Sequence, residues 1–385
     1  MNSLLLGANS PSQSAGSASL GLRKVLITGL SLLGTACGSG SSVGIQPGIP
    51  SGPLGRLLVA NTRGNDVVQV DPNTGALLGT FIPPETGGLF SPDTMILGPD
   101  ANDDGIPDLY ISSGNQPADS PEQGASAILV FDGLTGALIG PLVADDPTTD
   151  ADETGGLFRP YGIAFGPDGL LYVSSFLSDQ ILRYDGATGA FFDVFASGDQ
   201  LPGGLNGPNG LLFGPDGSLY VTTQGSVAVD GEADFSFGLP SQILRYDIAT
   251  GSSTVFATPD PSPESFGFVS LLGLAIGPDG LLYTSDFAND IRIYDLATGS
   301  QVGEALSTNY TGTDPSSNFV GSLSFGLNGI LYAVGFDNSD GDNPIGAVLR
   351  YDTTVGQPFP SIGSTGPIFV EPTAVLNRPI GVLFY

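Results

Sequence analysis

A short motif that recurs along most of the chain constrains its fold more than any other feature. An aspartate followed by a tight turn is found six times, roughly fifty to sixty residues apart, and such self-similarity is typical of repeat architectures. The six copies are VDPNTG (70–75), FDGLTG (131–136), YDGATG (184–189), YDIATG (246–251), YDLATG (294–299) and YDTTVG (351–356).

One complete unit, residues 162–196, predicts four strands: GIAFG, LLYVSS, ILRYD and FFDVFA. The first and second strands are joined by Pro-Asp-Gly, where glycine supplies a positive φ. The third and fourth are joined by Asp-x-x-Thr-Gly, in which the aspartate side chain can accept the turn amides. We therefore assign these aspartates to turn chemistry and exclude them as catalytic candidates.

Six four-stranded units predict an all-β fold, a six-bladed β-propeller over residues 55–385. The first unit begins with its second strand, RLLVAN (56–61), while the chain finishes RPIGVLFY (378–385), which is similar to RPYGIAF (159–165). We expect the C-terminal strand to pair with residues 56–61 and complete blade one. An up-and-down barrel or a seven-bladed ring accounts for this arrangement less well.

The N-terminal 37 residues have the pattern of an export signal. Arg23 and Lys24 precede a short apolar run (25–36) and Cys37, and residues 38–54 form a flexible Gly/Ser/Pro tether. LLGTAC resembles a bacterial lipobox, with Gly34 where leucine is usual, which implies lipidation of Cys37. Gly38 favours delivery to the outer membrane. We expect an outer-membrane lipoprotein, or else a secreted extracellular protein, without any intramolecular disulfide because Cys37 is the only cysteine.

The charge is strongly negative. Beyond Cys37, eight arginines face 39 acidic residues, and eight minus 39 gives −31. Such a surface repels nucleic acid and anionic lipid and attracts divalent cations, so the expected membrane contact is the lipid anchor alone. Adaptation to a salty exterior explains the same composition. We expect a monomer.

One copy of the turn between first and second strands is swollen. Residues 98–114 read GPDANDDGIPDLYISSG, against GPDGLLYVSS at 166–175. Asp100, Asn102 and Asp104 alternate, Gly105 permits a sharp turn, and the Ile106 carbonyl and Asp108 follow, which suits Ca²⁺. The segment also resembles the calcium loops of FG-GAP and integrin-type propellers. We expect structural calcium here; a solvated acidic hairpin is the alternative. DNSDGDN (337–343) has poorer spacing.

The turns GPDG-x-LYV and RYD-xx-TG resemble those of the NHL-repeat and SMP-30/gluconolactonase-like six-bladed propellers, across nearly all of residues 56–385. In gluconolactonases a central divalent ion is held by Glu, Asn and Asp residues at the blade starts. Asn209 matches the family's metal-binding asparagine. Leu272 replaces the expected aspartate and Ile380 an acid, so the resemblance implies an incomplete set of channel ligands.

The longest predicted loops join second to third strands (113–126, 224–241, 335–346) and successive blades (82–92, 144–160, 306–319). These two connection types share one face of a propeller, here termed the loop-rich face. Aligning the starts of the first strands gives one position per blade: Ile380, Asp93, Tyr161, Asn209, Leu272 and Gly321. We expect Asp93, Tyr161 and Asn209 to form a ligand patch at the channel mouth; loop packing between blades is the alternative.

The leading prediction is a cell-surface binding or scaffold protein that recognises a protein, small molecule or glycan through the loop-rich face. The alternative is a metal-dependent hydrolase of the gluconolactonase type, and a purely structural envelope protein is a third possibility. No histidine is present, so histidine-dependent lyase chemistry and a Ser-His-Asp triad are excluded. No residue is predicted to be catalytic.

Overall fold

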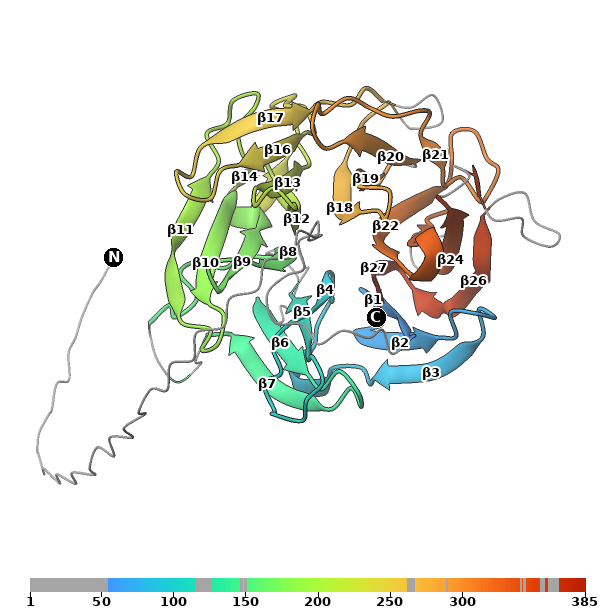
Figure 1. Ribbon diagram of the computed structural model, residues 1–385, viewed down its shortest axis with the longest axis horizontal. Coiled ribbons are helices and arrows are strands. Elements are labelled where there is room, and N and C mark those ends of the chain that lie inside the picture. Colours follow the sequence, from blue (N-terminus) through green and yellow to red (C-terminus); the bar gives the residue numbers. More distant parts are fainter. Residues whose placement is uncertain are drawn as a thin grey trace, which may run out of the picture. The chain divides into compact units, whose positions relative to one another are not determined.

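A computed structural model describes residues 55–114, 126–145, 148, 151–261, 267–288, 290–339, 341, 344–353, 357–358 and 367–385. Over these ranges, six antiparallel sheets are arranged around a central axis as a six-bladed β-propeller (Figure 1). The predicted fold class is confirmed. The expected export signal, Cys37 and the tether lie outside the described residues. None of the helices in the described ranges is long and apolar enough to cross a membrane.

The blades follow one another in chain order. Blade one contains β27 (Pro379–Phe384), β1 (Leu57–Asn61), β2 (Asp66–Val70) and β3 (Leu77–Ile82). Blade two contains β4 (Met95–Leu97), β5 (Leu109–Ser113), β6 (Ala127–Phe131) and β7 (Leu138–Val143). Blade three contains β8 (Pro160–Phe165), β9 (Leu170–Ser175), β10 (Gln180–Asp185) and β11 (Phe191–Ser197).

The second half repeats this order with two irregularities. Blade four contains β12 (Pro208–Phe213), β13 (Leu219–Thr223), β16 (Ile243–Tyr246) and β17 (Ser253–Ala257). Blade five contains β18 (Leu271–Ile276), β19 (Leu281–Asp286), β20 (Asp290–Asp295) and a two-residue β21 (Leu306–Ser307). Blade six contains β22 (Asn318–Phe325), β23 (Ile330–Asp337) and β24 (Ile345–Asp352), with β25 (Gln357–Pro358) and β26 (Ile368–Asn377) both pairing with β24.

The C-terminal strand closes the ring as predicted. β27 pairs with β1 in antiparallel register, with Val382 opposite Val59. Beyond the strand, the Tyr385 N–H donates to the Arg56 carbonyl at 3.0 Å, and the Arg56 N–H donates to the Tyr385 carbonyl at 2.8 Å. The Tyr385 hydroxyl then donates to the Gly133 carbonyl of blade two at 2.6 Å. The last residue therefore joins blade one to its neighbour.

The hydrophobic core lies between the blades. Alternate residues of a strand point to opposite faces, so each sheet must bury both faces against its neighbours. On β1, Leu58 and Ala60 pack against blade two, whereas Leu57 and Val59 pack against blade six. Every other pair of neighbouring blades encloses its own apolar cluster. This explains why the inner strands contain continuous apolar runs.

The repeated turns have the predicted chemistry. Asp185 Oδ1 accepts hydrogen bonds from the Thr188 amide and hydroxyl, both at 2.8 Å, and these bonds lower the pKa of Asp185. The Pro-Asp-Gly turn between the first and second strands has a further role, in side-chain hydrogen bonding, that the sequence did not reveal. Asp168 accepts a hydrogen bond from the buried Tyr172 hydroxyl at 2.8 Å, and Asp279 accepts one from Tyr283 at the same distance. The Asp-x-x-x-Tyr spacing thus fixes both the turn and the blade interface.

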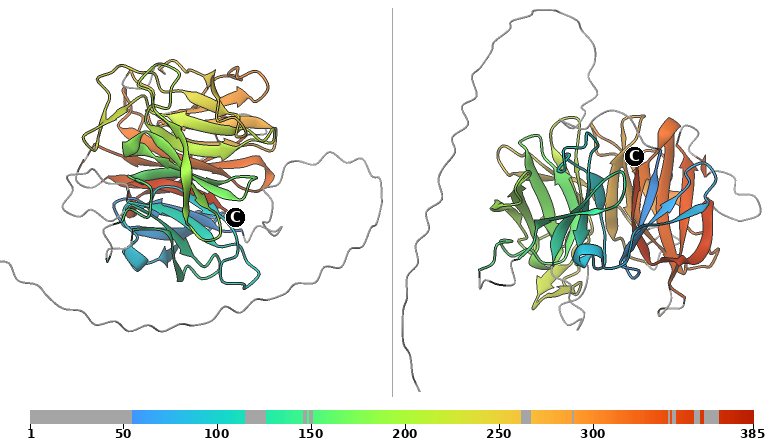
Figure 2. Two further views of the ribbon diagram at one scale, coloured as in Figure 1. Left: turned by 90° about the vertical axis from the view of Figure 1, so that its left-hand side faces the viewer. Right: turned by 90° about the horizontal axis from the view of Figure 1, so that it is seen from below.

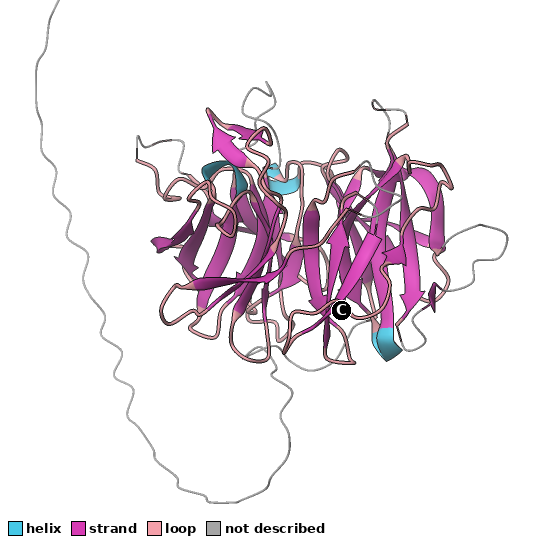
Figure 3. Ribbon diagram, turned by 90° about the horizontal axis from the view of Figure 1, so that it is seen from above, coloured by secondary structure: helices cyan, strands magenta, loops and turns pink. Residues whose placement is uncertain are grey.

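The two faces differ as expected, with two corrections. A hairpin of β14 (Val227–Val229) and β15 (Glu232–Asp234) projects from the loop-rich face (Figure 2, yellow-green). The short 3-10 helices η1 (Thr86–Gly88) and η2 (Phe176–Ser178) lie on that face, and η3 (Leu327–Gly329) lies on the opposite one (Figure 3). The predicted loop 335–346 is shorter than expected, because β23 extends to Asp337 and β24 begins at Ile345. The predicted loop 306–319 begins with β21.

Candidate functional site

A β-bulge interrupts the innermost strand at the position that the sequence alignment selected. In four blades the register skips two residues, after Pro160, Pro208, Leu271 and Val320. A similar irregularity in blade one leaves Ile380 between the paired residues Pro379 and Gly381. The skipped positions therefore include Tyr161, Asn209, Leu272, Gly321 and Ile380. Since a bulge redirects the side chain that it carries, these residues leave the pattern of the sheet.

Hydrogen bonds between blades hold this level of the channel together. The Ser174 hydroxyl donates to the Asn209 carbonyl of the next blade at 2.7 Å. Close approach requires glycine, because a Cβ on Gly162 would lie 2.3 Å from the Asn209 carbonyl oxygen. Equivalent hydrogen bonds between neighbouring blades run from the Ser112 hydroxyl to the Tyr161 carbonyl at 2.8 Å and from the Thr222 hydroxyl to the Leu272 carbonyl at 2.5 Å. The backbone of these positions is thereby engaged, and their side chains are left to face the channel.

A cavity of about 750 Å³ opens at this level, on the loop-rich face. The structure brings the three predicted ligand residues Asp93, Tyr161 and Asn209 to its wall, and all three are largely buried. Leu272 and Ile380 line the same cavity. We call this space the channel-mouth cavity.

Two arginines that the sequence analysis did not select also line the cavity, Arg159 and Arg378. Both directly precede a proline, in the RP dipeptides that begin the similar segments 159–165 and 378–385. Both adopt left-handed backbone conformations, with φ of 56° and 50°. At the equivalent position of blade four the chain has Gly207, with φ of 63°. A non-glycine residue in this region costs about 1–3 kcal/mol, and such strain concentrates at functional sites.

Each guanidinium lies over aromatic rings. Arg159 lies 5.4 Å from the ring centroids of both Tyr161 and Phe176, whose rings are 4.7 Å apart. Arg378 lies 5.5 Å from the centroid of Phe336.

The Phe336 ring belongs to a group of three phenylalanines. Phe287 and Phe319 stack at 4.5 Å with an interplanar angle of 12°, and Phe336 lies 6.1 and 5.9 Å from them. Phe287 and Phe319 line the channel-mouth cavity. The cavity therefore has two aromatic walls, each with one guanidinium.

The electrostatics of the cavity favour negative charge. Burial lowers the pKa of Arg378, and the neighbouring guanidinium groups of Arg63 and Arg159 lower it further, while Tyr161 and Asp93 act in the opposite direction. Within the described ranges, no residue forms a hydrogen bond or ion pair with the Arg378 guanidinium. Burial also raises the pKa of Tyr161, so its hydroxyl remains protonated and available as a donor.

A half-buried aspartate fixes the rim of the cavity. Asp179 accepts hydrogen bonds from the Ala228 amide of the projecting hairpin at 2.6 Å and from the Gly207 amide at 2.9 Å. Burial raises the pKa of this carboxyl group, and the two amide bonds oppose that shift. The hairpin brings Ala233, and the exposed Phe235 beyond it, to the cavity wall. One carboxylate thus positions both the hairpin and the backbone beside Asn209.

The donor set does not suit a gluconolactonase-type metal ion. Among the six aligned positions at the starts of the first strands, three residues that line the cavity have side-chain oxygens: Asp93, Asn209 and the phenol of Tyr161. Leu272 and Ile380 present apolar groups. Hard cations require several oxygen ligands, and two nearby guanidinium groups raise the electrostatic cost of a further positive charge.

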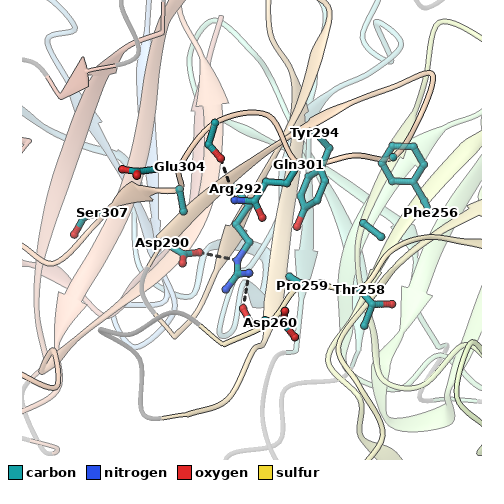
Figure 4. Close-up of a pocket in the computed structure, with 14 residues that line it drawn as sticks. Phe256, Thr258, Pro259, Asp260, Asp290, Arg292, Tyr294, Gln301, Glu304 and Ser307 are labelled. Carbon is teal, nitrogen blue, oxygen red and sulfur yellow. Dashed lines mark hydrogen bonds and ion pairs between the residues drawn. The ribbon is translucent and has the colours of Figure 1, made fainter.

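A second cavity, of about 830 Å³, lies beside the short fourth strand of blade five (Figure 4). Arg292 is the central side chain, and it donates to Asp290 at 2.9 Å, to Asp286 at 3.1 Å and to the Asp260 carbonyl at 2.7 Å. The side chains of Arg292, Asp286 and Asp290 are 5% exposed or less. Because the guanidinium is already bonded on three sides, this network is structural.

The swollen turn lies on the face opposite the loop-rich one, and its side chains bond to its own backbone. Asp100 accepts the Asp104 and Gly105 amides at 3.2 and 2.7 Å, and Asp104 accepts the Ile106 amide at 2.8 Å. Asp108 is fully buried; it accepts the Ala101 amide at 2.7 Å, and burial raises its pKa. In the described part of the chain, no three carboxylates are grouped closely enough to hold a metal ion in this conformation.

Comparison with known proteins gives the fold. No protein-family model matches the sequence, and no curated protein matches it. Among solved structures, a chain of a nidogen–laminin complex aligns with a TM-score of 0.55 at 13% identity, covering 85% of this chain and 97% of that one. A protein of unknown function from Bacteroides caccae aligns with a TM-score of 0.51 at 12% identity and the same coverage. A proposed gluconolactonase aligns at 18% identity with a TM-score of 0.47, over 73% of this chain and 79% of its own.

Proposed function

We propose that this chain is an exported, lipid-anchored binding protein that holds a small ligand in the channel-mouth cavity. The observation that carries this proposal is the cavity itself. Aromatic and apolar walls surround a few convergent polar groups, as is typical of ligand sites, and the volume suits a small molecule. The interblade hydrogen bonds beneath it provide a rigid scaffold. A hydrolase of the gluconolactonase type is less well supported, because the donor set does not suit the metal.

A neutral aromatic probe tests this proposal. N-phenyl-1-naphthylamine fluoresces on leaving water, and we expect it to bind with saturable, one-to-one stoichiometry. Asn209→Trp should block it: the indole would enter the cavity, while the interblade bond would survive because it uses the Asn209 backbone carbonyl. Asn73→Trp, at an exposed turn position outside the cavity, is the matched control. Equal probe binding by both variants, or no saturable binding by the parent protein, would refute the proposal.

The anchoring part of the proposal concerns Cys37. A lipidated cysteine would become the mature N-terminus and retain the protein in the membrane fraction of the producing cell. We expect Cys37→Ser to release the protein into the soluble fraction. Mass spectrometry of the parent protein should give the mass of the chain that begins at Cys37 plus the mass of the attached lipid. Recovery of unmodified, soluble parent protein would show that the chain is simply secreted.

The swollen turn is the proposed site of a structural calcium ion. Asp100, Asn102, Asp104, the Ile106 carbonyl and Asp108 would supply its ligands. An oxygen that accepts an amide retains a second lone pair, so the observed turn bonds are compatible with an ion. Calcium should raise the Tm, because an ion that binds only the folded state stabilises it by about 2.7 kcal/mol at a hundred times its Kd.

Asp104→Ala should remove most of the calcium-dependent rise in Tm. Asp103→Ala is the matched control, because that side chain is absent from the predicted ligand set. Thermal denaturation with and without calcium measures both variants. A parent protein whose Tm does not respond to calcium would refute the site.

A further inference from the structure

The channel-mouth cavity is lined by more basic than acidic side chains, whereas the molecule as a whole is strongly acidic. The chain has 39 acidic residues against ten basic ones, and Arg183, Arg245 and Arg292 each pair with aspartates. Arg159 and Arg378 line one cavity, and the charges of Arg63 and Arg159 both act on Arg378. Asp93 is the only carboxylate on the cavity wall among the described residues. A local excess of positive charge therefore persists within a strongly acidic protein.

We propose that this cavity selects small organic oxyanions: an apolar or aromatic body carrying a carboxylate, sulfonate or phosphate group that Arg378 and Arg159 bind. This inference rests on the proposed function, since it names the class of ligand for the same site. Guanidinium groups match the geometry of planar oxyanions, and such charge-assisted bonds are the strong ones. The aromatic rings beneath each guanidinium would contact the ligand body.

The backbone gives independent support for a role of these arginines beyond folding. The turn before Asn209 reaches the same left-handed conformation with Gly207, so the fold does not require arginine there. Arg159 and Arg378 nevertheless occupy the strained equivalent positions. Ser91 has the equivalent position of blade two with φ of 49°, so the turn accepts a short side chain as well as glycine. The two arginines differ from both in placing a guanidinium group at the cavity wall, where it can bind a ligand.

A pair of probes that differ by one group tests the inference. 8-Anilinonaphthalene-1-sulfonate is N-phenyl-1-naphthylamine with an added sulfonate. We expect the parent protein to bind the sulfonate at least ten-fold more tightly than the neutral probe, and added salt should narrow that difference. Arg378→Gln should weaken sulfonate binding about ten-fold, as expected for loss of a charge-assisted hydrogen bond, and change neutral-probe binding by less than two-fold. Arg245→Gln, which removes an arginine from an exposed ion pair with Asp216, should change neither.

The outcomes separate the two proposals. Neutral-probe binding without any preference for the sulfonate, or a sulfonate affinity that Arg378→Gln leaves unchanged, would overturn the anion inference and leave the proposed function standing. Failure of both probes would overturn the proposed function itself. Arg378→Gly adds a readout for a merely structural role: we expect its Tm to equal or exceed that of the parent protein while sulfonate binding falls. A lower Tm together with lost binding would show that the arginine serves the fold.

Discussion

Removal of residues 380–385 is expected to unfold or aggregate the protein. These residues form most of β27, the strand that completes blade one, and they include the buried Ile380, Val382 and Tyr385. Each such side chain contributes about 1.5–3 kcal/mol by burial, so the loss is comparable to the whole stability of a typical domain, about 5–15 kcal/mol. The truncation would also expose the edge of β1, and unpaired edges promote association.

Size-exclusion chromatography and thermal denaturation measure this effect. The control is a deletion of similar size within the predicted tether, residues 43–48, which should change neither the elution volume nor the Tm. A truncated protein that remained monomeric and kept its Tm would show that β27 does not close the ring in solution.

The second large effect is expected at Arg292. Arg292→Met would leave Asp286 and Asp290 buried without their cationic partner, and loss of one member of a buried ion pair typically costs about 3–5 kcal/mol. Burial already raises the pKa of Asp286, so without the guanidinium its pKa should rise further. Urea denaturation should show a large fall in the free energy of unfolding.

Arg245→Met is the matched control for Arg292→Met. Its guanidinium lies 2.6 Å from Asp216, yet the arginine side chain is 42% exposed and the aspartate side chain 34% exposed. Water screens such pairs, and they contribute about 0–1 kcal/mol. Similar losses in the two variants would contradict the structural role assigned to the buried network.

The repeat made the fold predictable, because the information that defines a blade is local. Tight turns such as 166–169 and 185–189 fix strand ends through glycine conformation and aspartate hydrogen bonds, whichever blade they join. Ring closure was predictable for the same reason, since residues 378–385 resemble the start of a complete unit. The shortened fourth strand of blade five was not predictable, because nothing in the residues after Gly299 marks where pairing with β20 stops.

The candidate site was predictable in part. Alignment of the repeats selected Asp93, Tyr161 and Asn209, which line one cavity, although their role as ligand contacts stays a prediction. It did not select Arg159 and Arg378, because their significance depends on backbone conformation and on contacts between distant blades. The RP dipeptide that these two segments share was visible in the sequence and could have drawn attention to both. The calcium, anchoring and localisation predictions also remain to be tested.

We propose that the channel mouth binds an anion and that calcium binds on the opposite face. Anomalous diffraction from crystals of residues 38–385, grown with calcium and soaked in bromide, would locate both ions in one experiment. We expect calcium at residues 100–108 and bromide in the channel-mouth cavity beside Arg159 and Arg378. Calcium only beside Asn209, with no bromide in the cavity, would refute both sites and support a metal-dependent hydrolase.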